Sequence, residues 1–180
     1  GKIKAHTNLT REARKILLRA VNARRQSDKR YEDLLDMLLD ARYEDGTPMS
    51  DKQLIDEILI LFTAGHETTS NALSFTSMLL ALHPDKQDLL FTEVSKLPDH
   101  KDDWFAYLDA CVYTKQVIEE SMRLYPPAYF IDRINIEDDE FEGLKIPKNT
   151  NILLSFEEMH KHPKYWEQPK AFLPERFEGR

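Results

Sequence analysis

The sequence has a single cysteine, Cys111, in 180 residues, which excludes an internal disulfide framework and any cysteine-rich zinc or iron–sulfur cluster. It has no run of about 18 or more apolar residues, so we expect no membrane span, and its N-terminal part lacks the apolar core of a signal peptide. Basic residues are in deficit: 25 Lys and Arg against 32 Asp and Glu give a net charge of −7. These absences predict a soluble, cytoplasmic protein without a nucleic-acid partner.

Glycine is scarce and proline is unevenly distributed. The sequence holds 5 glycines, and seven of its nine prolines follow residue 97. Hydrophobic residues make up 41% and aromatic residues 10%, which is enough for a packed core. We therefore predict one domain of the α+β class, mainly α-helical with a small β-sheet. Its helical part is expected over residues 10–124, and the small sheet and a proline-rich meander over residues 125–180.

Periodicity and turn residues predict the individual elements. Thr10 is expected to cap the first helix. Ser50 and Gln53 form a capping-box pattern, and nothing stops the helix that follows until Pro84. The predicted helices cover a stretch after Thr10, residues 31–42, residues 51–82, a stretch after Pro84 and residues 105–124. In the last of these helices the residues expected to face inward are Leu108, Cys111, Val112, Ile118 and Met122. The predicted extended segments are 130–136, 141–146 and 151–156, with an acidic turn at 137–140.

The predicted helix over residues 51–82 is apolar almost all round in its middle, at residues 58–65, which is typical of a helix buried on every side. Gly65, Glu67 and Thr68 are unfavourable there, because Gly costs about 1 kcal/mol relative to Ala and a buried charge needs a partner. One interpretation is a groove in which Gly65 admits a ligand while Glu67 and Thr68 relay protons. The other is a structural kink with a satisfied polar cluster. The segment alone leaves both open.

Two further patterns have ordinary explanations. His66 and Glu67 begin a zincin-like motif, but Ser70 stands where the second histidine is needed. His160 and His162 are expected to be solvated surface residues. In the stretch 119–123, Arg123 can pair with Glu119 or with Glu120, and such helical pairs are common on surfaces.

Three segments then resemble a known family. Residues 64–69 (AGHETT), 120–127 (ESMRLYPP) and 172–177 (FLPERF) are similar, in this order, to signatures of the cytochrome P-450 monooxygenases. Residues 143–150 and 162–166 resemble further stretches of the family. The HETT residues are closest in type to soluble bacterial fatty-acid hydroxylases and their microsomal relatives. The resemblance implies part of the cytochrome P-450 fold, with a long central helix over a haem.

The resemblance also implies an activity. Such an enzyme carries haem b and inserts one oxygen atom from O2 into an apolar substrate such as a fatty acid. It takes its electrons from a redox partner, which can be a reductase, a ferredoxin or a flavodoxin. Thr68 would hydrogen-bond dioxygen at the haem, and Glu67 would help to deliver protons.

The remaining site residues follow from the same resemblance. Glu120, Arg123 and Arg176 would form a buried carboxylate–guanidinium triad, which suits arginine because its planar fork binds a carboxylate through two hydrogen bonds. The residues implied at the cofactor are Ala64, Gly65 and Arg133, and those implied at the substrate pocket are Phe62, Ala128 and Phe130.

The sequence departs from the family at the metal ligand. The axial cysteine of such enzymes lies in a loop after the segment that matches residues 172–177, and this sequence ends at Arg180. Cys111 precedes that segment and lies on an apolar helix face, so we predict that it is not the ligand. The alternative function is therefore a catalytically silent helical scaffold, or a fragment without bound haem.

Overall fold

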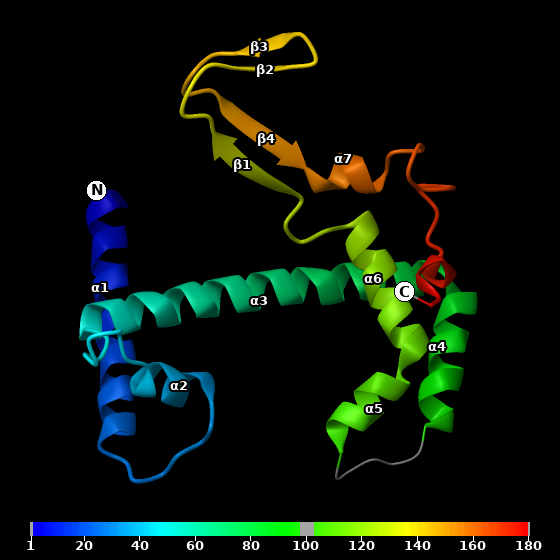
Figure 1. The fold of residues 1–180 in the computed structure, drawn as a ribbon. Helices are drawn as coiled ribbons and strands as arrows, with labels where there is room; N and C mark the ends of the chain where they lie inside the picture. The colour runs from blue at the N-terminus through cyan, green and yellow to red at the C-terminus, as the bar shows by residue number, and fades with distance from the viewer. Residues whose placement is uncertain (1, 98–102, 180) are drawn as a thin grey trace. The chain divides into compact units, whose positions relative to one another are not determined.

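The computed structural model describes residues 2–97 and 103–179, and it is mainly helical with two small sheets. The predicted class, mainly α with a small β part, is confirmed. The chain divides into two compact units, one that ends at His66 and one that begins at Glu67. The long helix α3 (Asp51–Leu82) contributes its first half to one unit and its second half to the other. Figure 1 shows the elements in chain order.

The first unit contains α1 (Lys2–Arg25), α2 (Leu34–Asp40) and the first half of α3. Its core is formed by Val21 of α1 with Leu54 of α3 and its neighbour Ile55. The predicted cap at Thr10 is wrong, because the helix already includes Lys2 and no Gly or Pro interrupts the residues between them.

The connection from α1 to α2 is organised by the buried carboxylate of Asp36. It accepts the backbone N–H groups of Tyr31 at 2.6 Å and Glu32 at 3.0 Å, and Arg24 Nη1 at 2.8 Å. The side chain of Asp33 accepts the Asp36 N–H at 3.0 Å and so caps α2. This cap starts the helix three residues later than the predicted residue 31.

The bounds of α3 are those predicted from the sequence. The Ser50 hydroxyl accepts the Gln53 N–H at 3.3 Å, as the capping pattern requires. Pro84 opens the next helix, α4 (Pro84–Lys96), where its missing N–H costs nothing.

The second unit adds α5 (Trp104–Ala110) and α6 (Val112–Leu124). One continuous helix over residues 105–124 was predicted, and this is wrong, because the chain leaves helical geometry at Cys111. The carboxylate of Glu93, on α4, accepts the N–H groups of Tyr113 at 2.5 Å and Thr114 at 2.9 Å. A side chain from another helix therefore caps α6 and allows it to begin anew.

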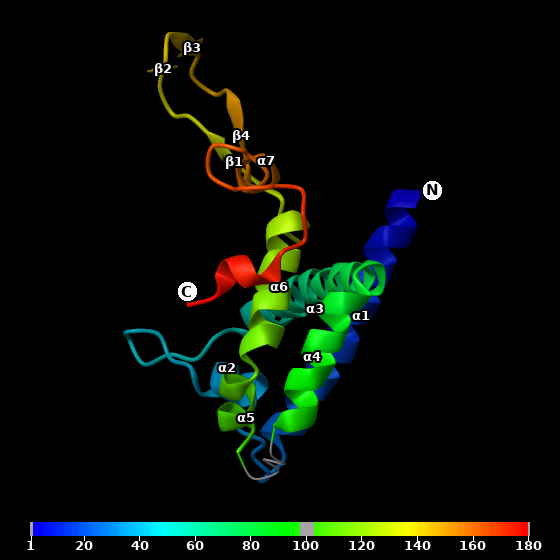
Figure 2. The same cartoon turned by 90° about the vertical axis from the view of Figure 1, so that its right-hand side faces the viewer.

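The hydrophobic core of the second unit lies where α3, α6 and the C-terminal segment meet. It contains Leu79, Val117, Leu124 and Phe172. The short 3₁₀ helix η1 (Pro174–Phe177) packs against α6, as Figure 2 shows.

The strands form two antiparallel pairs. β1 (Phe130–Ile134) pairs with β4 (Asn151–Ser155), which leads into α7 (Phe156–His160), and β2 (Asp139–Phe141) pairs with β3 (Leu144–Ile146). A single extended segment was predicted over 141–146, but Glu142 and Gly143 have positive φ angles of 49° and 83° and make a tight turn there. The acidic residues predicted as a turn partly belong to β2.

Among the residues that the structure describes, no helix is both long enough and apolar enough to cross a membrane.

Candidate functional site

A groove of about 350 Å³ lies between the second half of α3 and α6, and Thr68 lines it. On α3 the lining positions recur at spacings of one, three and four residues, so they share one helix face. Apart from Leu73, this face carries small and hydroxyl-bearing side chains, whereas α6 contributes larger apolar ones. The lining residues are Thr68, Thr69, Ala72, Leu73, Thr76, Ile118, Met122 and Pro127.

Hydroxyl groups along this part of α3 bond to carbonyl groups of the same helix. Ser74 Oγ donates to the Ser70 carbonyl and Thr76 Oγ1 to the Ala72 carbonyl, both at 2.7 Å. Such bonds give a backbone carbonyl oxygen a second hydrogen-bond donor and favour bending of the helix. The groove therefore borders a helix segment whose backbone bonding is perturbed by its own side chains.

The middle of α3 is exposed in this chain, so the predicted burial on every side is wrong for the described residues. Ile60 is 62% and Phe62 71% exposed, and both Glu67 and Thr68 are exposed. The physical reason is that the described residues place too few side chains against this stretch to cover its apolar faces. Glu67 therefore carries its charge without the desolvation penalty that the sequence pattern suggested.

The α3 residues up to His66 belong to the first unit. Phe62 lines an apolar cavity of about 330 Å³ together with residues of α1 and α2, such as Leu17 and Leu38, and it stacks on His66 with ring centroids 5.9 Å apart. Ala64 and Gly65 are exposed. A Cβ atom added at Gly65 would meet nothing within 4 Å, so the backbone there is open to a ligand.

Three other predicted site residues lie after α6 and do not line the groove. Ala128 is exposed in the loop before β1, and Phe130 is 41% exposed and packs edge-on against Tyr129. Arg133 is exposed on β1 and donates from Nη1 to the neighbouring Asp132 carbonyl at 2.7 Å. The groove is instead lined in this stretch by Pro127, which was not among the predicted site residues.

The structure does bring Glu120, Arg123 and Arg176 together. Glu120 is fully buried and accepts Arg123 Nε at 2.7 Å and Nη2 at 2.9 Å, one on each carboxylate oxygen. Its Oε1 also accepts Arg176 Nε at 3.0 Å and the Leu173 N–H at 2.9 Å. Of the two carboxylates that the spacing allowed for Arg123, the structure therefore selects Glu120 and not Glu119.

All five N–H groups of the Arg123 guanidinium have acceptors. Besides the two bonds to Glu120, Nη1 donates to the His160 and Pro169 carbonyls at 2.7 and 2.9 Å, and Nη2 donates to the Ala171 carbonyl at 3.2 Å. Such complete pairing offsets much of the cost of burying the charge. Arg123 therefore fastens the loop between α7 and η1 to α6.

Trp166 lies beside both arginines of this network. Its ring centroid is 4.9 Å from Arg123 Cζ and 5.9 Å from Arg176 Cζ, which are cation–π distances. Arg176 Nη1 also donates to the Glu167 carbonyl at 3.0 Å. The aromatic ring and the loop carbonyls thus surround two guanidinium groups that share one carboxylate.

Cys111 has the surroundings of a structural thiol. It is buried, and its Sγ donates to the Tyr107 carbonyl at 3.3 Å. Burial, and then the nearby charge of Glu93, raise the pKa of the Cys111 thiol above its ordinary value. The protonated form is therefore favoured, which is unfavourable for a metal-bound thiolate. The predicted inward face is only partly realised, because Leu108 is 63% exposed.

The histidines form no metal site within the described ranges 2–97 and 103–179, where no three or more His, Cys, Asp or Glu residues are grouped suitably. His162 is exposed, as predicted. The prediction of a solvated His160 is wrong, because its Nδ1 is buried without a hydrogen-bond partner and its ring lies between Phe156 and Trp166.

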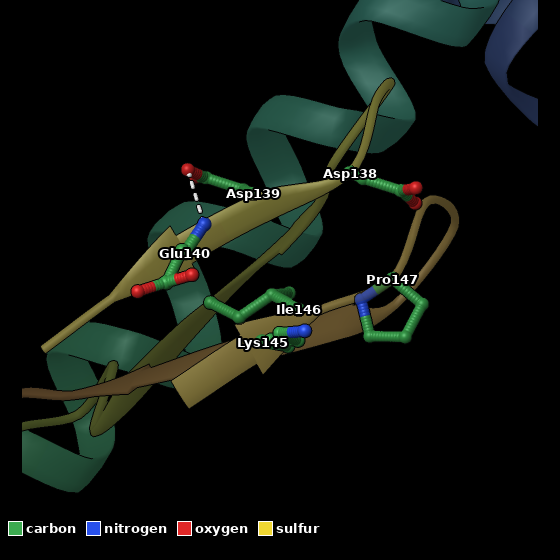
Figure 3. Close-up of a pocket in the computed structure, with 6 residues that line it drawn as sticks. All are labelled: Asp138, Asp139, Glu140, Lys145, Ile146 and Pro147. Carbon is green, nitrogen blue, oxygen red and sulfur yellow. Dashed lines mark hydrogen bonds between the residues drawn. The ribbon is translucent and has the colours of Figure 1, made fainter. Parts of the chain in front are cut away.

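A second cavity in this unit, of about 520 Å³, lies at the β2–β3 hairpin (Figure 3). It is lined from one side by acidic residues, Asp138, Asp139 and Glu140, and from the other by Lys145, Ile146 and Pro147. The Asp139 carboxylate accepts a hydrogen bond from the Glu140 N–H, with an N···O distance of 2.8 Å. This bond is the dashed line in Figure 3. None of the predicted site residues lies there.

The sequence model of the family described as Cytochrome P450 matches residues 1–180, which includes both units. This chain belongs to the cytochrome P450 family. It is 37% identical to cytochrome P450 3A13 of Mus musculus over 87% of the chain, and 34% identical to cyclooctat-9-en-7-ol 5-monooxygenase of Streptomyces melanosporofaciens over 92% of it.

Solved P450 structures share the fold. The retinoic-acid-bound cyanobacterial CYP120A1 is similar with a TM-score of 0.85 and 34% identity over 92% of the chain, and the cytochrome P450 CYP102L1 with a TM-score of 0.86 and 26% identity over 98%. The matched region is 32% and 36% of the two curated relatives and 38% and 41% of the two solved chains. This P450 chain thus spans about a third of the length of its relatives.

Sequence reasoning missed several residues that organise this part of the P450 fold. Thr76 and Ser121 form a buried hydrogen bond of 2.8 Å between α3 and α6. The hydroxyl of Thr76 follows Thr69 at a spacing of seven residues, and this pattern was available in the sequence. Residues 162–166 resembled a family stretch, but the sequence did not indicate that the Trp166 ring meets Arg123 and Arg176, because a loop conformation determines this contact.

Proposed function

We propose that the protein containing this chain is a haem-dependent monooxygenase that converts an apolar substrate RH, with O2, two electrons and two protons, to ROH and water. The observation that carries the proposal is the groove that Thr68 lines, where its hydroxyl meets an open, mostly apolar space, with the exposed Glu67 one residue earlier in the chain. Membership of the P450 family supports the reaction class. We further propose that both units belong to one P450 domain.

The residues present fit one side of a haem. The groove offers apolar surface from Leu73, Ile118 and Met122 on which a flat, apolar group could lie. Cys111 does not fit as the iron ligand, because it is a buried thiol with a raised pKa. From the family resemblance we propose that Ala64, Gly65 and Arg133 would contact the haem, and the cysteine that binds the iron would have to be a residue other than Cys111.

When bound, the haem supplies the activation of O2 and the transfer of the oxygen atom. The chain's own residues would then hold and move protons. The Thr68 hydroxyl can act as a hydrogen-bond donor and as an acceptor, so it could orient a polar group in the groove and pass a proton to it. Glu67, one residue earlier and exposed, can exchange protons with solvent at its carboxylate oxygens and pass them on.

The Glu120 network would act on the structure around the reaction. Arg123 and Arg176 bond through their guanidinium groups to loop carbonyls from His160 to Ala171. We propose that this buried network holds the loop and η1 in place against α6. It would fix geometry and take no part in proton transfer.

We propose that the substrate is apolar and of the size of a fatty acid. From the family resemblance, Phe62, Ala128 and Phe130 would contact it. The proposed electron donor is a reductase, a ferredoxin or a flavodoxin. Two relatives support the substrate class: one solved structure contains retinoic acid, and one curated relative is named for an apolar ring alcohol. The exposed Phe62 and Phe130 supply apolar surface for such a ligand.

Isotope labelling tests the proposal directly. The haem-loaded protein, with a redox partner and dodecanoic acid or retinoic acid as probe substrates, is expected to place one ¹⁸O atom from ¹⁸O2 in the product. Label from H2¹⁸O instead would contradict it. A protein that binds no haem, and therefore forms no product, would favour the silent scaffold.

A further inference from the structure

The second half of α3 and α6 cross in the second unit, and Figures 1 and 2 both show α6 lying across α3. Apolar contacts hold the crossing together: Leu79 packs in the core with Val117, and Phe75 stacks on Tyr125 with ring centroids 4.7 Å apart. Within this apolar contact lies the hydrogen bond between the hydroxyl groups of Thr76 and Ser121, at 2.8 Å.

The direction of this hydrogen bond follows from the number of hydrogens. Thr76 Oγ1 is 2.7 Å from the Ala72 carbonyl, which can only accept, and 2.8 Å from Ser121 Oγ. A hydroxyl has one hydrogen, so Thr76 donates it to Ala72, and Ser121 donates to Thr76. Thr76 is 8% and Ser121 0% exposed, so water cannot replace either partner.

One member of the pair lines the groove and the other lies next to it. Thr76 is itself a lining residue, and Ser121 follows the lining residue Ile118 by three positions on α6, a spacing that makes the two neighbours on the helix surface. The hydrogen bond therefore fixes the separation between the α3 wall, which carries Thr68, and the α6 wall.

We propose that Thr76 and Ser121 are positioning residues that set the width of the groove and hold the Thr68 hydroxyl at its place in it. Neither residue touches the reacting atoms. The inference rests on the proposed function in naming Thr68 as the group that is positioned, whereas the hydrogen bond and its place at the groove are independent of any reaction.

Four variants separate positioning from general packing. Thr76→Val removes the hydroxyl and keeps the shape of the side chain, and Thr76→Ser keeps the hydroxyl. Ser121→Ala removes the donor from α6. Ser77→Ala is the matched control, because Ser77 Oγ donates only within α3, to the Leu73 carbonyl at 2.8 Å, and is exposed.

Backbone amide exchange is measured first, in the haem-loaded protein. Thr76→Val and Ser121→Ala are expected to speed exchange in the stretch 68–80 and in α6 by about tenfold, because a buried donor or acceptor loses its partner. Exchange in α4 should not change. Thr76→Ser and Ser77→Ala should remain within about twofold of the unaltered protein. At unchanged haem content, product formed per electron should fall in the first two variants and recover in Thr76→Ser.

Equal exchange in Ser121→Ala and Ser77→Ala would overturn the inference, and so would faster exchange with an unchanged product yield per electron. An unaltered protein that binds no haem would contradict the proposed function. In that case the amide exchange alone decides whether the pair fixes the two groove walls.

Discussion

Glu120 is a fully buried charged residue that connects α6 to the C-terminal segment of the second unit. Its carboxylate is fully buried and accepts hydrogen bonds from two arginines and one backbone N–H group. A buried carboxylate with fewer partners would be much less stable than a solvated one. The side chain therefore has a structural role that follows from its surroundings alone.

Replacing Glu120 by alanine is expected to lower the free energy of unfolding by about 3–5 kcal/mol, because two guanidinium groups lose their shared counter-charge. Glu119→Ala is the matched control, since Glu119 is the neighbouring carboxylate that Arg123 does not use; its cost should be about 1 kcal/mol or less. Denaturant unfolding of both variants checks this. Equal losses would show that the wrong carboxylate has been assigned to Arg123.

Trp166 is expected to stabilise the same network through its ring. Trp166→Leu should lower the free energy of unfolding by about 2 kcal/mol or more, because two cation–π contacts and the packing of the ring are lost. Trp104 is 65% exposed, so Trp104→Leu should change it by about 0.5 kcal/mol or less.

A double-mutant cycle of Trp166→Leu with Arg176→Gln separates the two contributions. The account expects the losses to be less than additive, since both changes remove the same contact. Strict additivity would mean that the Trp166 ring does not interact with Arg176.

At the scale of elements, α3 shows what a sequence can predict. Its start at Asp51 and its end before Pro84 follow from local chemistry, a capping hydroxyl and a residue without an N–H group, and both are confirmed. The break at Cys111 could not be predicted, because the cap of α6 is Glu93, a side chain from another helix. The sequence therefore predicts a helix end when residues next to that end determine it, and not when a side chain from another helix does.

The candidate site also contains residues that the sequence predicted and residues that it did not. The spacing of Glu120 and Arg123 predicted a pair, and the family resemblance added Arg176, which the structure brings to the same carboxylate. The groove combines residues from α3, α6 and the following loop, and no periodicity indicates which faces of two helices meet. Thr76 was therefore not selected from the sequence.

The connection between α1 and α2 is expected to respond to acid. The hydrogen bonds from Arg24, and then the Asp36 N–H, lower the pKa of Asp33 from 3.8 to about 2, and Arg24 followed by the Tyr31 N–H lowers that of Asp36. A lowered carboxyl pKa stabilises the folded state above the ordinary pKa, and this stabilisation is lost as the pH falls toward the folded value.

The free energy of unfolding should therefore fall between about pH 4 and pH 2, as measured by denaturant titration at several pH values. Arg24→Gln should flatten this dependence, because the carboxyl pKa values then return toward normal. Arg19→Gln, at an exposed arginine of the same helix, should not. A steep acid loss that persists in Arg24→Gln would contradict the assignment.

At the scale of the whole molecule, composition and pattern predicted a mainly helical chain, and the structure and the family match agree. The predicted burial of the middle of α3 was wrong, because the residues that the structure describes place too few side chains against it. This chain spans about a third of the length of its relatives, with 32% and 36% of the two curated ones. Exposed side chains such as Phe62 are consistent with a surface that contacts further protein or ligand.

The central claim is that Thr68 handles protons in the groove, and product formed per electron consumed tests it most directly. In the haem-loaded protein, Thr68→Ala should lower this ratio together with productive turnover, which should fall by roughly 10²–10⁴-fold, while haem content and thermal stability stay unchanged. Ser74→Ala removes a nearby exposed hydroxyl of α3 that lies outside the groove and should leave the ratio unchanged. A Thr68→Ala protein that forms as much product per electron as the unaltered one would contradict the account.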